Sequence, residues 1–221
     1  MSRIVNLGVL VSGSGSNLQS IIDNIEKGAL PARIRIIISN NPGAFALERA
    51  RKHGIPSAVI EHGGFSSRDQ YDQKLVDTLK TQDVELVVLA GFMRVLSPLF
   101  LRAFPMRIMN IHPALLPCFP GTHGQKKAFD YGVKFSGCTV HFADEGVDTG
   151  PIIIQAVIPV YDTDTEETLS QRILKEEHRI YPKAIRLYAE GKLRVEGRKV
   201  RIQNHPQPED NPRHNPPIAD F

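Results

Sequence analysis

The sequence predicts an α/β protein with a doubly wound, mostly parallel central sheet that antiparallel strands extend in the C-terminal half. Apolar runs bounded by turn residues alternate with helix-like segments over residues 4–111. These runs are uninterrupted and rich in β-branched residues, as is typical of strands covered on both faces. Near residue 133 the alternation of strands and helices ends. Two strand-like runs follow each other directly there, which predicts the antiparallel extension.

Strands and helices alternate in the first half of the chain. Strands are expected at residues 4–11, 34–39, 57–61, 84–91 and 107–111. Helices are expected at residues 16–28, 44–54 and 67–82, where apolar residues recur at spacings of three and four. This order predicts parallel strands joined by helical crossovers.

The second half is expected to extend the same sheet rather than to form another domain. Residues 133–142 and 150–160 predict a hairpin, and a helix follows near residues 165–190. Since no linker-like stretch separates the two halves, we expect a single domain over residues 1–192.

Residues 193–221 are expected to be a C-terminal extension. Its first part, at 193–203, predicts a short strand pair. Residues 204–221 are polar and rich in proline, which predicts a loose tail.

Composition excludes several classes of protein. The 221 residues are 41% hydrophobic, enough for a substantial core. The 27 Lys and Arg are scattered among 24 Asp and Glu and form no basic block, so a nucleic acid is not the expected partner. Cys118 and Cys138 have no metal-binding spacing, so we expect no metal and a reducing, cytoplasmic location. No apolar run approaches the roughly 18 residues of a membrane helix.

A turn of small residues, SGSGSNLQSII at 12–22, follows the first strand and opens a helix. Backbone N–H groups at a helix N-terminus bind anions, and small side chains allow close approach. The turn lacks the lysine of a Walker A loop and the third glycine of a dinucleotide fingerprint, so a monophosphate fits better. A tight turn that binds nothing is the alternative.

An amide and an imidazole occur together in MNIHPALLPCFPG at 109–121. Alternation along a strand places Asn110 and His112 on one side, near a carboxyl end where open parallel sheets carry their sites. An amide can polarise a carbonyl and an imidazole can move a proton. The alternative is a surface histidine, but the prolines that follow fix the loop in one shape.

The loop ADEGVDTG at 143–150 supplies the carboxylates Asp144, Glu145 and Asp148. A carboxylate near an imidazole favours its charged form, so we expect a raised pKa at His112 if this loop reaches it. The alternative is an ordinary turn, since Asp and Gly are common turn residues.

Four stretches together resemble the formyltransferases that use 10-formyltetrahydrofolate. They are GSGSN at 13–17, LAGFMRVLSP at 89–98, MNIHPALLPCFPG at 109–121 and DEGVDTGPII at 144–153. The resemblance covers roughly residues 3–192 and implies a Rossmann-like formyltransferase fold, with phosphate bound by the N-terminal half and folate by the C-terminal half. It also implies formyl transfer from 10-formyltetrahydrofolate to the amine of phosphoribosylglycinamide, by a monomer or homodimer without a metal.

The resemblance implies a role for each matching residue. The catalytic residues would be Asn110, His112 and Asp148, with His112 as imidazolium. Phosphate would be held by Gly15, Ser16 and Asn17, and the amine end of the substrate by Glu177. Folate would be held by Arg68, Met93, Arg94, Val95, Leu96, Asn110, Asp144, Glu145, Gly146, Val147 and Asp148. The chain departs from the family pattern at Cys118 and Gly124.

Three other functions stay open. A 10-formyltetrahydrofolate hydrolase would be expected to carry a regulatory domain before the first strand. An enzyme that formylates initiator methionyl-tRNA would be expected to carry an additional basic domain after Gly191. Since neither of these domains is recognised in the sequence, we expect the small-molecule transferase. The hydrolase and a non-catalytic phosphate-binding module are the alternatives.

Overall fold

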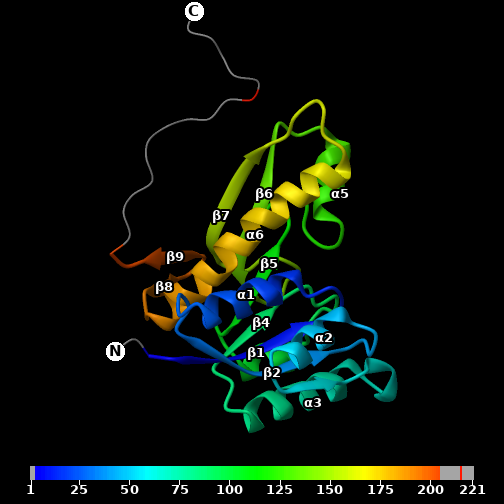
Figure 1. Cartoon of the computed structure of the whole chain (residues 1–221), viewed down its shortest axis with the longest axis vertical. Coiled ribbons are helices and arrows are strands. Elements are labelled where there is room, and N and C mark those ends of the chain that lie inside the picture. Colours follow the sequence, from blue (N-terminus) through cyan, green and yellow to red (C-terminus); the bar gives the residue numbers. More distant parts are fainter. Residues whose placement is uncertain (1–2, 205–214, 216–221) are drawn as a thin grey trace, which may run out of the picture.

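The computed structural model describes residues 3–204 and 215. In this part of the chain nine strands form one sheet, in the order β3-β2-β1-β4-β5-β6-β7-β9-β8 (Figure 1). The strands are β1 (Val5–Val11), β2 (Ala32–Ser39), β3 (Ser57–Val59), β4 (Leu86–Leu89), β5 (Ile108–His112), β6 (Phe135–Phe142), β7 (Ile152–Pro159), β8 (Leu193–Glu196) and β9 (Lys199–Ile202).

Helices connect most of these strands. They are α1 (Ser16–Glu26), α2 (Phe45–Lys52), the 3-10 helix η1 (His62–Gly64), α3 (Arg68–Thr81), α4 (Pro98–Ala103), α5 (Gly124–Tyr131) and α6 (Glu166–Ala189).

The predicted fold class is confirmed. Strands β1 to β5 are parallel to one another, whereas β6 pairs antiparallel with β5 and with β7. Strand β9 joins the far edge of β7 through one parallel pair, Ile152 with Lys199, and pairs antiparallel with β8. The sheet therefore continues through both halves of the chain, while the division of the chain at residue 192 stays a prediction.

Both faces of the parallel part are covered, as the β-branched runs predict. Alternate residues of β1 enter different clusters: Val9 packs with α1, α2 and α6, and Leu10 packs with α3 and α4. A strand with a core on each face needs apolar residues at every position, and β1 has only one residue that is not fully buried.

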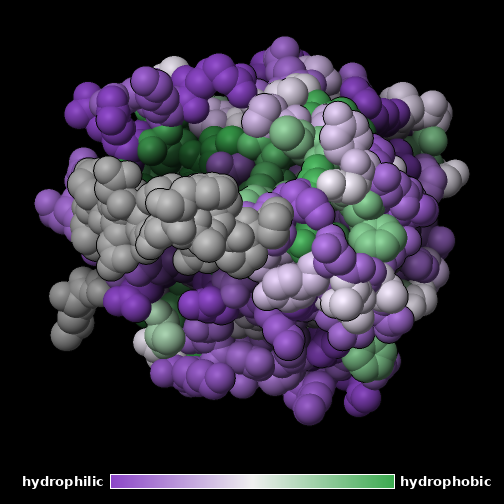
Figure 2. All heavy atoms as spheres, turned by 90° about the horizontal axis from the view of Figure 1, so that it is seen from above, coloured by the Kyte–Doolittle hydropathy of each residue, from purple (hydrophilic) through white to green (hydrophobic). Residues whose placement is uncertain are grey.

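Beyond the parallel strands, β6 and β7 project with α5 and the first part of α6 (Figure 1). Seen from that end, the surface is mainly hydrophilic, with hydrophobic side chains gathered in patches (Figure 2). Val157 on β7 and Tyr161 just after it are among the exposed apolar residues. In the part of the chain that the structure describes, no helix has both the length and the apolar composition to cross a membrane.

Every predicted strand and helix within the described residues is present, with ends shifted by a few residues. The helices α4 and α5 and the 3-10 helix η1 were not predicted. The sequence of α4, PLFLRA, has no polar face to give a helical period, and α5 follows a left-handed His123 without a capping side chain. The predicted loose tail lies outside the described residues apart from Asn204 and Asn215.

Candidate active site

Strand β5 carries Asn110 and His112 on one side, as the alternation predicts. It lies between β4 and β6, where Asn110 pairs with Leu89 on one side and with His141 on the other. Asn110 is half-buried and His112 is only 3% exposed. The side chain of His112 is therefore almost completely shielded from solvent, and that of Asn110 is partly shielded.

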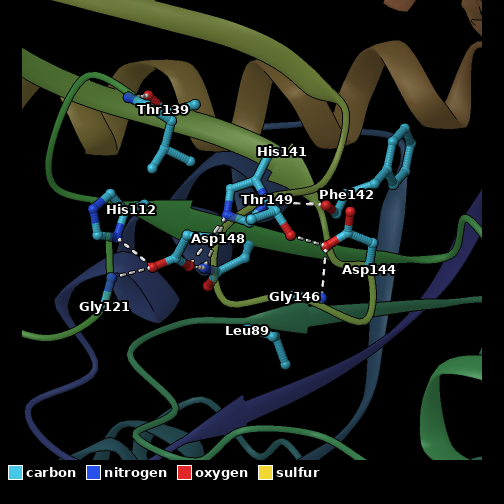
Figure 3. A network of polar contacts seen from close by, with 12 residues as sticks. Leu89, His112, Gly121, Thr139, His141, Phe142, Asp144, Gly146, Asp148 and Thr149 are labelled. Atoms are coloured by element: carbon cyan, nitrogen blue, oxygen red, sulfur yellow. Dashed lines mark hydrogen bonds and ion pairs between the residues drawn. The ribbon is translucent and has the colours of Figure 1, made fainter. Parts of the chain in front are cut away.

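The Asp148 carboxylate joins both residues. One oxygen, Oδ1, accepts a hydrogen bond from Asn110 Nδ2 at 3.3 Å, and Oδ2 lies 3.2 Å from His112 Nδ1. Oδ2 also accepts the Gly121 backbone N–H at 2.7 Å. Figure 3 shows Asp148 between the two imidazoles, with Gly121 beside it. Asp148 has a left-handed backbone conformation, with a φ of 55°.

Burial determines the charge state of His112. It lowers the pKa of His112 below the ordinary 6.5, and the nearby Asp148 carboxylate and the Phe119 carbonyl offset only part of this shift. The expected raised pKa is therefore wrong, because the sequence predicts the carboxylate but not the depth of the imidazole. Asp148 itself has a lowered pKa, because the nearby His141 and His112 imidazoles and the hydrogen bond from the Gly121 backbone N–H outweigh its burial.

Hydrogen-bond chemistry assigns the protons on His112. Nε2 lies 2.8 Å from the Phe119 carbonyl oxygen, which can only accept, so Nε2 carries a hydrogen. In the neutral ring Nδ1 is then unprotonated and faces Asp148. A proton that arrives at Nδ1 is stabilised by the carboxylate, so the pair is arranged to take up and release one proton.

His141 is a member of the cluster that the sequence reasoning missed. Its Nδ1 donates to the Phe142 carbonyl oxygen at 2.9 Å, and its Nε2 accepts from Asn110 Nδ2 at 3.2 Å and lies 3.6 Å from Asp148 Oδ1. The available signal was a histidine within the apolar run of β6, at the alternation that places it on the site face. Both N–H groups of the Asn110 amide thus have partners, at 3.2 and 3.3 Å.

The proline-rich loop after β5 lies against the imidazole, where its Phe119 carbonyl contacts His112. Thr139 on β6 donates to the Ala114 carbonyl and accepts the Leu116 backbone N–H, which fixes the start of the loop. A Cβ on Gly124 would lie 3.1 Å from His112 Nε2, so the glycine permits the close approach of α5. Cys118 is exposed.

The Gly/Ser loop (residues 12–17) begins α1 in a conformation that favours glycine. Gly15 has a φ of 70°, and a Cβ there would lie 2.7 Å from the Cβ of Ala46 on α2. Ser16 and Asn17 are the first residues of the helix, so their backbone N–H groups have no partner within it.

Glu177 of α6 is joined to this loop. Its carboxylate accepts a hydrogen bond of 2.7 Å from Asn17 Nδ2, and the two side chains are buried. Burial raises the pKa of Glu177, and the bond from Asn17 offsets part of the rise. Oδ1 of Asn17 is buried without a hydrogen-bond partner among the described residues.

The predicted folate residues lie on four segments: the start of α3, the segment after β4, strand β5 and the loop after β6. Met93, Arg94, Val95 and Leu96 follow β4, and the side chains of Met93 and Val95 are 72% and 53% exposed. The guanidinium of Arg94 lies 5.2 Å from the centre of the Tyr71 ring. Burial raises the pKa of Tyr71 to about 12, so the ring stays neutral beneath the cation.

The loop at 144–149 closes on itself, because Asp144 accepts hydrogen bonds from Gly146 N and Thr149 Oγ1. Glu145 is exposed and Val147 is 48% exposed, and only Asp148 reaches the cluster. Arg68 is exposed at the start of α3, and no contact within residues 3–204 joins it to the cluster. In the described residues no group of His, Cys, Asp and Glu could hold a metal ion.

Comparison with known proteins places this geometry in a family. The model of a family described as formyl transferase matches residues 5–185. Phosphoribosylglycinamide formyltransferase of Escherichia coli is 42% identical over 191 residues, which cover 86% of this chain and 90% of that protein. Glycinamide ribonucleotide transformylase 1 from Symbiobacterium toebii has a crystal structure with a TM-score of 0.90 and 51% identity, covering 91% of this chain and 95% of that one.

Longer relatives contain the same region. The trifunctional purine biosynthetic protein adenosine-3 of Drosophila pseudoobscura pseudoobscura is 54% identical over 190 residues, which are 85% of this chain and 14% of that protein. The chain thus spans about one seventh of the length of such relatives. The family model covers well over half of the sequence, and the fold, the identities and the match agree: the chain belongs to the formyl transferase family.

Proposed function

We propose that this chain transfers a formyl group from 10-formyltetrahydrofolate to the amine of 5'-phosphoribosylglycinamide, as a step of purine biosynthesis. The products are formyl-phosphoribosylglycinamide and tetrahydrofolate. The observation that carries the proposal is the Asp148 carboxylate, which contacts the amide of Asn110 and the imidazole of His112 at once. An amide donor and an imidazole held by a carboxylate are suited to acyl transfer to an amine. The printed names of the Escherichia coli and Symbiobacterium toebii relatives support the same substrate.

Asn110 stabilises the negative charge that develops on the formyl oxygen. Its two N–H groups make long hydrogen bonds, 3.2 Å to His141 and 3.3 Å to Asp148. An oxyanion is a stronger acceptor than a neutral imidazole nitrogen, so it competes for the N–H that faces His141. His141 is then a positioning residue, because it holds the amide with its nitrogen toward the cluster.

His112 and Asp148 handle the proton that the reaction releases and consumes. The attacking amine loses one proton as its bond to the formyl carbon forms, and the folate nitrogen gains one as its bond breaks. The lowered pKa makes His112 neutral near pH 7, so its Nδ1 starts as a proton acceptor. The Asp148 carboxylate stabilises the imidazolium until the proton leaves.

The two substrates fit the two ends of the site. Gly15, Ser16 and Asn17 hold the phosphate at the start of α1, where free backbone N–H groups favour an anion. Glu177 contacts the amine end of the same substrate. Its carboxylate already touches the loop through Asn17.

Folate lies between the segment after β4 and the loop at 144–148. The exposed apolar side chains of Met93, Val95 and Val147 provide surface for a flat ring system. Arg94, Leu96, and the backbone of Asp144, Glu145 and Gly146 complete these two walls, and the exposed Arg68 is available for the acidic tail of the folate. The cytoplasmic location and the monomeric or dimeric state stay predictions.

One assay tests the function. The full chain is mixed with 10-formyltetrahydrofolate, phosphoribosylglycinamide or both, and deformylation of the folate is followed by its absorbance. We expect turnover only when both substrates are present. Equal turnover without phosphoribosylglycinamide would identify a hydrolase, and binding of both compounds without turnover would identify a non-catalytic module; either result contradicts the proposal.

A further inference from the structure

Ser12, the first residue after β1, lies where three strands of the sheet end. Its backbone N–H donates to the Gly91 carbonyl at 3.1 Å, just beyond β4. Its side chain reaches Asn40, just beyond β2. The Gly/Ser loop, which is proposed to bind the phosphate, begins at Ser12. Ser12 also contacts Gly91, which lies just before the segment proposed to bind folate.

The hydroxyl of Ser12 has defined donor and acceptor roles. It lies 2.9 Å from the backbone N of Met93, which can only donate, so the hydroxyl accepts there. Its own hydrogen points to Asn40 Oδ1 at 2.6 Å. The amide of the neighbouring Asn41 also contacts the Ser12 carbonyl, at 3.4 Å. One half-buried hydroxyl thus links three loops.

Phe92 packs against the core cluster that contains residues of α3 and α4, but its neighbours on both sides are exposed. The Met93 side chain is 72% exposed, and Gly91 before it is also exposed. The end of the same segment is attached to α3: Arg94 lies over Tyr71, and the Ser97 backbone N–H donates to buried Asp72 at 2.6 Å. Two bonds of Ser12 therefore relate the start of the segment to β1 and the Gly/Ser loop: its backbone N–H binds Gly91, and its hydroxyl binds Met93. Of the two, the hydroxyl bond is the one that acts on the main chain at Met93 itself.

We propose that Ser12 is a positioning residue that fixes the folate-binding main chain at Met93 relative to the phosphate-binding loop. This inference rests on the proposed function, because it assigns the two segments to the two substrates. Transfer between two bound molecules requires their reacting atoms to meet within about 3–3.5 Å, so a shift of one segment against the other impairs the reaction. Ser12 sets that relation without touching either substrate.

Steady-state kinetics of Ser12→Ala, measured with each substrate varied in turn, tests the proposal. Loss of the hydroxyl removes the only partner of the Met93 N–H among the described residues. We expect KM for 10-formyltetrahydrofolate to rise by about threefold to tenfold, with a lower kcat, while KM for phosphoribosylglycinamide stays within about twofold. Partial unfolding would lower kcat and leave both KM values unchanged, so the KM split separates positioning from stability.

Two further variants make the test specific. Ser12→Thr keeps the hydroxyl and should restore a folate KM near that of the unmodified chain. Asn40→Ala leaves the Met93 bond in place but removes the acceptor that orients the hydroxyl, so it should raise the same KM by a smaller factor. If Ser12→Ala fails to fold, Asn40→Ala still tests the proposal. An increase only in KM for phosphoribosylglycinamide, or no increase in either KM, overturns it.

Direct binding separates this inference from the proposed function. Calorimetry with tetrahydrofolate should show weaker binding by Ser12→Ala than by the unmodified chain, with the same ratio as the KM values. Absence of formyl transfer by the unmodified chain would refute the proposed function alone. Equal tetrahydrofolate affinity of the two proteins, or equal increases in both KM values, would refute the role of Ser12.

Discussion

At His112, burial and a carboxylate act on the imidazole in opposite directions, and burial dominates. The ring is covered by the proline-rich loop and by Gly124, whose missing side chain allows α5 to approach it. The neutral ring faces Asp148 with its unprotonated nitrogen. In the proposed mechanism, His112 therefore takes up the proton during the reaction instead of holding it beforehand.

The pKa of His112 can be measured by following its imidazole resonances in an NMR titration. We expect a pKa below 6.5 in the free protein. In Asp148→Asn it should fall further, because burial remains while the carboxylate that raises it is lost. Asp144→Asn is the control, since Asp144 contacts Gly146 and Thr149 and should leave His112 unchanged. An unchanged or higher pKa in Asp148→Asn contradicts this description of the pair.

Glu177→Gln should stabilise the fold while it weakens the site. The folded pKa of Glu177 is raised above 4.5, so the native state binds the proton more tightly than the unfolded state. Its contribution to the free energy of unfolding is therefore lost as pH rises above about 4.5 and through the folded pKa. Glutamine removes this dependence, so its advantage in urea unfolding should be larger at pH 8 than at pH 5.

The same Glu177→Gln variant should raise KM for phosphoribosylglycinamide, since it loses the charge proposed for the amine end. Glu176→Gln is the matched control, because Glu176 is the adjacent residue and pairs with Arg179 at the surface. The same pH dependence of unfolding in the two variants would show that burial of Glu177 has no energetic consequence.

Residue types and spacing predicted Asn110 and His112 on one side of a strand, because alternation is a property of any strand. They did not predict His141, whose place beside Asn110 depends on the register of β6 against β5. Nor did they predict the depth of His112, since its burial depends on how the proline-rich loop and α5 pack over the ring. The charge states of these side chains depend on tertiary packing, which a local sequence pattern does not predict.

At the scale of elements, α6 fixes the strand ends that carry the site. The hydroxyl of Tyr181 lies 2.7 Å from the Met109 carbonyl and 3.0 Å from the Leu89 carbonyl, and the residue is fully buried. Met109 directly precedes Asn110, and Leu89 is the last residue of β4, four residues before Met93. Tyr181 therefore joins the ends of β4 and β5 through one polar group in the core.

Tyr181→Phe should destabilise the protein by about 1–3 kcal/mol, since it leaves two buried carbonyls without this partner. Thermal unfolding should show a decrease of roughly 2–4 °C for each kcal/mol. Tyr131→Phe is the control, because Tyr131 is 79% exposed and the change keeps its ring. Equal melting temperatures for the two variants would show that the bridge between the strands has no effect.

The longest helices that the sequence predicted have a regular apolar pattern. Helix α6 has 24 residues with a capping box at Thr165, and α1 and α3 are amphipathic. The short α4 and α5 have neither length nor capping, so tertiary contacts decide them.

At the scale of the whole molecule, one sheet brings the two proposed substrate sites together. Parallel pairing puts the ends of β1, β4 and β5 at one edge, so residues distant in sequence meet there. The alternation of strands and helices predicted this edge. It did not predict that the loop after β6 returns over β5, because that path depends on the left-handed Asp148 and on its bond to Gly121.

Turnover of Asp148→Asn tests most directly whether the cluster of Asn110, His112 and Asp148 carries formyl transfer. Asparagine keeps the size of the side chain and tolerates the φ of 55°, so the backbone should be preserved. We predict a decrease in kcat of about 10²–10⁴-fold with both substrates saturating, while calorimetry shows the affinity for phosphoribosylglycinamide within about twofold. A kcat within about threefold of that of the unmodified chain would contradict the assignment of the active site.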